Sequence, residues 1–506
     1  MRRLLLAVIA LLSFTATARA EWLEASSDHF VIYGDQGAKA IREFADRLER
    51  FHAGMSVILR RPPTQPSPSN RVSVYVVTNE AKVRQVLGAT NRYLAGAYLP
   101  RAGASIAIVP KLKGARSKYD MSGETILYHE YAHHFLWTLT ARTFPRWFIE
   151  GFAEYFASVK FKSDGSIVFG VPATHRAAEL AYSRDVPIRT LLEFDGGAGE
   201  KKKGHDSFYG QSWVLFHYLQ TAPERAGQLQ KYQQLLASGD TALEAAEGAF
   251  GDLDQLEKDM MSYIGRSKVT TFVVNAHALK TGTVNVRPLR AGEAEMMPVV
   301  LQSKAGVTQA EAVALLPEAR RIEAKYPNDP AVLAALAEAE FDADNDDEAI
   351  AVAERALAID PQQISAYLQK GYALTRKVKD AKLPYSAWKD VRSWWIKANR
   401  VENDHPIPLV QYYLSFVEAG EKPTRAAVDG LVWAMQLAPF DASVRWLVAN
   451  QMILDDRYAE AANVLAPLAY SPHPGEHTER ARRLLEEIES KAKGSAAPPQ
   501  EAVSAG

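Results

Sequence analysis

Two histidines separated by three residues form the strongest chemical pattern of this sequence. His129, Glu130 and His133 occur in the run HEYAH, inside a segment with helical spacing. Residues four apart in a helix turn through about 400°, so both imidazoles lie on one face and can bind one zinc ion at about 2.0–2.1 Å. Glu130 is rotated by about 100° from His129, so it can stand beside the metal and act as a general base toward water. His134 points away from the pair, and we interpret it as structural.

A third ligand is needed to identify a metal site, because the H-E-x-x-H pattern alone also arises by chance. The metzincin continuation would need glycine and histidine at the positions that Leu136 and Leu139 occupy. The other option is a glutamate from a following helix, and residues 145–155 read PRWFIEGFAEY. This run resembles the E-G-x-A-E-Y element of the gluzincins, a class of zinc metallopeptidases in which the first glutamate completes the metal site. The resemblance implies Glu150 as the third ligand of one zinc ion per chain.

A second glutamate follows on the same helix. Glu154 lies one turn beyond Glu150, where it could accept the free N–H of a ligating histidine. The alternative for both carboxylates is a solvated helix surface. The helix is rich in aromatic residues, however, and is expected to be mostly buried, where unpaired carboxylates would be costly.

The resemblance extends across most of residues 21–265 and is to the peptidase MA-like domain, which is often found in bacterial proteins with repeats behind it. It implies an α+β, thermolysin-like catalytic domain. In that family a strand lines the cleft and pairs with substrate backbone, and Gly96, Ala97 and Tyr98 match its sequence. An exposed strand edge can bind an extended peptide in this way. An ordinary sheet edge is the alternative.

The family also suggests a donor for the negative oxygen that develops in the transition state. Tyr209, in the run FYGQS, opens a helix at a place where the family often has a tyrosine. His205 is the substitute, and a tyrosine buried in the core is the structural alternative.

The surrounding elements are expected to change from mixed α/β to helical. Strands are expected at Phe30–Gly34, at Arg71–Val77, near Gly96 and near Ile106, from β-branched and aromatic runs. Helices are expected over residues 38–51, 122–141, 145–159 and 207–219. Residues 266–306 form a connector, possibly β in character, with the runs TTFVVNA, TVNVRPL and MMPVVLQ.

Residues 307–490 resemble tetratricopeptide (TPR) repeats, an α-helical solenoid. Alanines such as Ala349, Ala353 and Ala356 recur where two helices of a repeat pack closely, in register with a 34-residue period. Glu340 stands where that family prefers tyrosine. An irregular helical bundle is the alternative. The polar residues 491–506 are expected to be disordered.

The N-terminus and the composition indicate a cellular location. Arg2 and Arg3, the apolar run Leu4–Phe14 and Ala18-Arg19-Ala20 are typical of a signal peptide over residues 1–20. No later run is long enough to span a membrane. Cysteine is absent, so a metal would have nitrogen and oxygen ligands. We therefore expect secretion across an inner membrane into a bacterial periplasm.

These observations favour a zinc-dependent metallopeptidase with a peptide or protein substrate, and with repeats that bind a protein partner. Lys and Arg total 59 against 60 Asp and Glu, so no basic excess points to nucleic acid. Two alternatives stay open. One is a catalytically silent scaffold of the same fold, and the other is a zinc amidase that acts on cell-wall material.

Overall fold

The computed structural model describes residues 21–91, 94–111, 121–139, 143–195, 206–266, 268–471 and 476–495. The expected signal peptide, His205 and residues 496–506 lie outside this part of the chain. Among the described residues, no helix combines the length and the apolar character needed to cross a membrane.

A six-stranded mixed sheet forms the centre of the N-terminal half, in the order β4-β5-β3-β2-β1-β9. Strands β2, β3 and β5 run parallel, and the others pair antiparallel with their neighbours. The strand bounds are β1 Leu23–Ser26, β2 Phe30–Gly34, β3 Val72–Val77, β4 Ala97–Leu99, β5 Ile106–Pro110 and β9 Asn285–Pro288. The four strands expected from residues 30–106 are therefore present as β2, β3, β4 and β5.

Alternate residues of β3 point to opposite faces of the sheet, and both faces are covered. Val74 and Val76 pack with α1 (Ala38–Ile58) and α3 (Gly123–Leu139) in the main core. Tyr75 and Val77 face a second core under α2 (Glu80–Val86) and α11 (Ala291–Ala305). Helix α3, which carries the histidine pair, thus packs on one face of the sheet.

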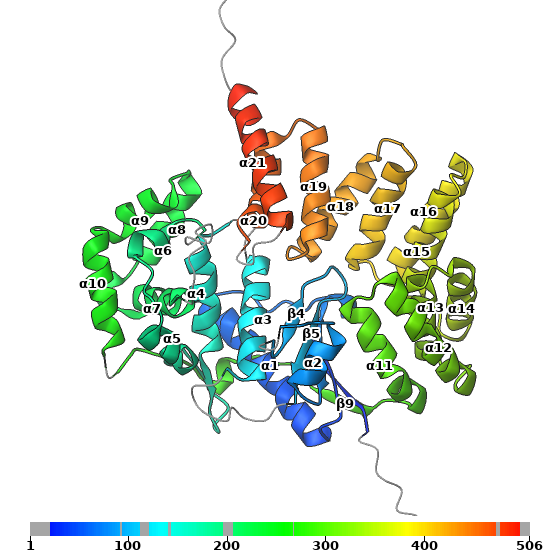
Figure 1. Ribbon diagram of the computed structural model, residues 1–506, viewed down its shortest axis with the longest axis horizontal. Helices are drawn as coiled ribbons and strands as arrows, with labels where there is room; N and C mark the ends of the chain where they lie inside the picture. Colours follow the sequence, from blue (N-terminus) through cyan, green and yellow to red (C-terminus); the bar gives the residue numbers. More distant parts are fainter. Residues whose placement is uncertain are drawn as a thin grey trace, which may run out of the picture.

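Helix α4 (Arg146–Ala157) packs against α3 on one side and against α7 (Phe208–Thr221) on the other. Gly151 is required at the second contact, because a Cβ there would lie 2.5 Å from the Ser212 carbonyl oxygen. Further helices gather beyond α4 in Figure 1, namely α5 Ala177–Tyr182, α6 Ile188–Leu192, α8 Gln228–Ser238, α9 Ala242–Phe250 and α10 Leu253–Ile264. Strands β6 Val159–Phe161, β7 Ile167–Phe169 and β8 Phe272–Val274 form a second, three-stranded sheet.

The connector differs from its expected boundaries. Its first two runs are strands, β8 and β9, and both belong to sheets of the N-terminal half, which therefore extends beyond residue 265. The third run, MMPVVLQ, is not a strand but part of α11. Met297 and Leu301 cover the sheet, whereas Met296 and Val299 pack against the first repeat helices. Burial on two sides makes the run continuously apolar, and this hides its helical period.

The C-terminal half is a solenoid of consecutively packed helices. They are α12 Gln309–Lys325, α13 Pro330–Asp342, α14 Asp346–Ile359, α15 Ile364–Asp380, α16 Tyr385–Val401, α17 Pro406–Glu418, α18 Arg425–Leu437, α19 Ala442–Leu454, α20 Tyr458–Ala469 and α21 Glu476–Ser495. Ala349, Ala353 and Ala356 are fully buried where small residues were expected. Helix α21 continues to Ser495, so the first five residues of the stretch expected to be disordered, 491–495, are helical.

The solenoid does not extend away from the sheet but returns to it. Figure 1 shows the helices arching from α11 around to α19, α20 and α21, which lie beside α3. Hydrogen bonds hold the middle and later repeats to loops of the sheet. The Ala102 backbone N–H donates to Asp441 at 2.7 Å, and Ser69 donates from its backbone and its hydroxyl to Glu402 at 2.9 and 2.8 Å. Phe440 and Arg445 also contact His134 and Trp137 of α3, so the later repeats pack beside the helix that bears His129 and His133.

Candidate metal centre and its cleft

Helices α3 and α4 have well-defined starts that fix the register of the histidines and Glu150. Ser122 caps α3 by accepting the Thr125 N–H at 3.1 Å. Pro145 precedes α4, where its missing N–H has no cost. The two helices pack against each other, as expected for a pair joined by a short turn. This contact brings Glu150 to the histidine pair.

The three expected ligand atoms form a compact triangle. Nε2 of His129 lies 3.0 Å from Nε2 of His133, and Oε2 of Glu150 lies 3.3 and 3.4 Å from these two nitrogens. Tetrahedral zinc with bonds of about 2.0–2.1 Å keeps two ligand atoms about 3.3–3.4 Å apart. The triangle therefore has close to the edge lengths that one zinc ion requires. Among the described residues, these three make the only such group of potential ligands.

Glu150 is the group that most needs a cation. Its side chain is 0% exposed, and neither carboxylate oxygen accepts a hydrogen bond from any residue that the structure describes. Burial alone would raise the pKa of Glu150, but the imidazoles of His133 and His129 outweigh it and hold that pKa well below its usual range. A buried carboxylate without donors is costly unless a cation compensates it. Two imidazoles and one carboxylate are suitable ligands for zinc, so the residue types of the site fit this metal.

Glu154 contacts the back of the same site. Its Oε1 lies 3.2 Å from Nδ1 of His129, and the same carboxylate accepts from His175 at 2.7 Å and from Arg176 at 2.9 Å. Burial opposes protonation of His129, but Glu150 and Glu154 outweigh it and raise the pKa of His129 to about 10. Glu154 is thus placed to orient the His129 ring from the side opposite the ligand triangle.

Tyr209 lies at the start of α7, half-buried and close to this network. The Arg176 guanidinium stacks over its ring at 4.7 Å. Burial, together with the charge of Glu150, raises the pKa of Tyr209 to about 12. The tyrosine therefore stays protonated at neutral pH and keeps its O–H as a donor. His205, the expected substitute, lies outside the described residues.

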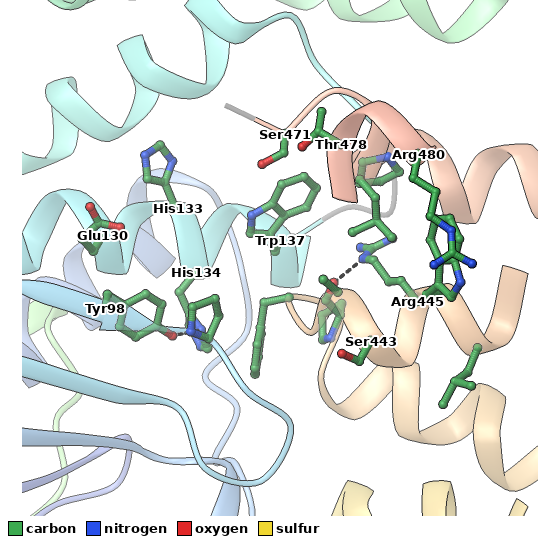
Figure 2. Close-up of a pocket in the computed structure, with 18 residues that line it drawn as sticks. Tyr98, Glu130, His133, His134, Trp137, Ser443, Arg445, Ser471, Thr478 and Arg480 are labelled. Atoms are coloured by element: carbon green, nitrogen blue, oxygen red, sulfur yellow. Dashed lines mark hydrogen bonds between the residues drawn. The ribbon is translucent and has the colours of Figure 1, made fainter. Parts of the chain in front are cut away.

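A cavity of about 600 Å³ opens beside the histidines, and Glu130, His133 and Trp137 line it from α3. Residues of the last repeats line its other side, and Figure 2 shows Trp137 between Glu130 and His133 on one side and Arg445 and Arg480 on the other. Glu130 is half-buried and open to this space, whereas Glu150 is fully buried behind it. The general base expected from the sequence thus lies on the accessible side of the ligand triangle.

Strand β4, which contains Ala97 and Tyr98 and begins directly after Gly96, is the terminal strand of the sheet among the described strands. Tyr98 lines the cavity and its hydroxyl lies 2.5 Å from Nδ1 of His134 (Figure 2). His134 therefore ties the edge strand to α3, in line with a structural role. Its ring also packs on Phe440 of the repeats at 4.2 Å.

Several residues of the site were not anticipated. His175 and Arg176 hold Glu154, and Phe440, Arg445 and Trp446 line the cavity from the solenoid. Neither group forms a recognisable spacing with the histidines. The signal that could have found Arg445 is that it is the single charged residue of α19, in a run of mostly apolar residues.

Comparisons with known proteins concern the repeats. A tetratricopeptide repeat family model matches residues 330–373, which span α13, α14 and the start of α15. No curated protein matches the chain significantly. The chain is similar to a thermophilic TPR protein of Thermus thermophilus, at 20% identity and a TM-score of 0.33 over 40% of this chain and 100% of that one. It is also similar to yeast Tom70, at 12% identity and a TM-score of 0.28 over 62% of this chain and 71% of that one. The family match and the paired helices show that the solenoid contains tetratricopeptide repeats.

Proposed function

We propose that this protein is a zinc-dependent metallopeptidase of the gluzincin type, with a thermolysin-like catalytic region and tetratricopeptide repeats that also take part in protein binding. The observation that carries the proposal is the ligand triangle of His129, His133 and Glu150, in which a fully buried carboxylate has no hydrogen-bond donor among the described residues. The expected signal peptide would place the enzyme outside the cytoplasm, in a bacterial periplasm.

In this proposal the two histidines and Glu150 hold one zinc ion. When bound, zinc supplies Lewis-acid chemistry that polarises a peptide carbonyl and makes water more acidic. Glu130 lies on the cavity side, where it takes a proton from a water molecule and later delivers it to the leaving amine. Glu154 orients His129 through its Nδ1.

Substrate positioning is assigned to two other elements. The free edge of β4 offers backbone N–H and C=O groups to an extended peptide, next to Tyr98 on the cavity wall. The protonated hydroxyl of Tyr209 is the proposed donor to the developing oxyanion. Tyr209 is not among the described residues that line the cavity, so its role requires a substrate that reaches beyond this cavity.

The test combines metal analysis with proteolysis. Glu130→Gln should keep about one zinc per chain and cleave denatured casein about 100-fold to 10,000-fold more slowly, because only proton transfer is removed. Glu354→Gln, at an exposed position on α14, is the control and should leave both measurements unchanged. Undiminished cleavage by Glu130→Gln would overturn the mechanism.

Two results would point to the alternatives instead. Stoichiometric zinc without cleavage of any member of a peptide library would favour the silent scaffold. Cleavage of cell-wall amides without cleavage of peptides would favour the amidase.

A further inference from the structure

The wall of the cleft opposite the metal centre is built by the last repeats, and it carries positive charge. Arg445 of α19 and Arg480 of α21 line the same cavity as Glu130 and His133 (Figure 2). Glu130 is the one carboxylate among the described lining residues. The two walls of the cleft thus differ in charge, with the acidic group beside the metal site and the cations across from it.

Arg445 is a buried cation that the described protein does not neutralise. Its side chain is 2% exposed, its Nε donates to the Pro439 carbonyl, and its Nη1 lies 3.5 Å from the Val464 carbonyl. Its Nη2 has no hydrogen-bond partner. Burial lowers the pKa of Arg445 to about 10, and no carboxylate offsets this effect. A guanidinium in this state still carries its charge at neutral pH, and its Nη2 lacks an acceptor among the described residues.

Another buried arginine of the solenoid does have a carboxylate partner. Arg392 of α16 is 7% exposed, yet it donates to Glu421 at 2.7 Å and to the Ser415 carbonyl at 3.1 Å. The fold therefore supplies a carboxylate to the buried arginine that lies away from the cleft. Arg445 lacks such a partner at the place where a ligand could enter.

Arg480 adds a second cation to the same wall. It is exposed, and its guanidinium lies over the Trp446 ring at 4.6 Å, which orients it within the cleft. Trp137, Phe440 and Trp446 make the surroundings apolar, and a charge pair is stronger there than in water.

The position of this charge relative to the metal site follows from α3. Trp137 lies four residues after His133, one helical turn and about 6 Å along the axis. The Arg445 guanidinium carbon lies 5.4 Å from the Trp137 ring centroid. Laid end to end, the axial step from His133 to Trp137 and the distance from Trp137 to the guanidinium come to about 11 Å. An extended peptide advances about 3.3–3.6 Å per residue, so about three of its residues would cover this length.

We propose that the repeat wall of the cleft is a carboxylate-binding subsite, in which Arg445 and Arg480 receive an anionic group of a peptide within about three residues of the bond to be cleaved. The inference rests on the proposed function in one respect, because it takes the ligand to be the substrate peptide. The carboxylate could be the C-terminus of the peptide or an acidic side chain. In either case the repeats contribute directly to substrate choice.

The experiment measures binding, so that it does not depend on catalysis. Three fluorescein-labelled hexapeptides of one apolar sequence are titrated against Glu130→Gln protein by fluorescence anisotropy: one with a free C-terminal carboxylate, one with a C-terminal amide, and one amide-ended with an internal glutamate. At least one anionic peptide should bind about tenfold more tightly than the neutral amide. The anionic peptide that does so identifies the source of the carboxylate.

Variants assign the preference to the arginines. Arg445→Met and Arg480→Gln, each in the Glu130→Gln background, should reduce the preference to less than about twofold, whereas Arg483→Gln, an exposed neighbour on α21 outside the described cavity lining, should retain it. Removing an uncompensated buried cation should not lower the melting temperature of Arg445→Met. If that variant fails to fold, Arg480→Gln still gives the result.

The subsite is overturned if the three peptides bind with equal affinity, or if both arginine variants keep the preference. These outcomes are independent of the proposed function. Casein cleavage by the wild type with no anionic preference removes the subsite alone, and anionic preference without any cleavage removes the peptidase alone.

Discussion

Two buried glutamates, one in each half of the molecule, show how differently the chain treats the same side chain. Glu150 of α4 is 0% exposed and Glu340 of α13 is 2% exposed. Glu340 accepts from Arg320 through two bonds of 2.7 and 2.8 Å and from the Asn345 amide at 2.9 Å. Within the described part of the chain, Glu150 accepts no hydrogen bond, and its Oε2 lies near the Nε2 atoms of two histidines. The repeat thus provides donors for its buried glutamate, whereas the candidate metal centre provides none among the described residues.

This difference teaches which buried charges are structural and which point to a ligand. A carboxylate held by a guanidinium and an amide is satisfied within the chain and contributes to the packing of its repeat. A carboxylate aimed at two imidazole nitrogens, at the spacing of tetrahedral zinc ligands, is instead arranged so that one cation could contact all three groups. Glu154 lies between the two cases, because Arg176 and His175 satisfy it while it also contacts His129.

The largest effect is expected for Glu150→Gln, which tests whether the buried glutamate is a zinc ligand. The variant should bind zinc more than about 100-fold more weakly, because losing even a residue that only supports a metal ligand lowers metal affinity by about 10–100-fold. Zinc affinity is measured by competition with a chromogenic chelator. Zinc should also raise the melting temperature of the wild type and leave that of this variant unchanged. Full zinc occupancy in Glu150→Gln would show that the triangle is not a metal site.

A smaller effect is expected for Glu154→Gln. The variant keeps the shape of the side chain but removes the charge that faces Nδ1 of His129, so zinc affinity should fall by about 10–100-fold while one site per chain persists. The same chelator competition measures it. If zinc affinity is unaltered and only the melting temperature falls, Glu154 serves Arg176 and His175 rather than the metal ligand.

The comparison also shows what could be predicted from the sequence. The i, i+4 spacing of His129 and His133 is local, so helical geometry alone placed them together. Glu150 needed the resemblance to a family, because the angle between α3 and α4 is set by packing that includes Gly151 against α7. The tetratricopeptide register was predictable because small residues recur at a fixed period where the helices touch.

What escaped prediction depends on contacts between distant segments. His175 and Arg176 reach Glu154 across more than twenty positions. Arg445 reaches the cleft only because the whole solenoid arches back to α3. The run MMPVVLQ of α11 resembles a strand in sequence for a related reason, because its apolar residues pack into two separate cores.

The smallest effect is expected for Glu340 of the repeats. Its substitution tests whether a buried glutamate with its own donors has only a structural role. Glu340→Gln removes a charge-assisted pair with Arg320, which is 52% exposed, so the loss of stability should be only about 1 kcal/mol. That corresponds to a fall of about 2–4 °C in the melting temperature, followed by differential scanning fluorimetry. Zinc content and casein cleavage should not change, because Glu340 is satisfied by its own chain. A loss of zinc in Glu340→Gln would mean that the repeats and the metal centre are coupled through the fold, and burial with complete hydrogen bonding would then no longer mark a purely structural charge in this protein.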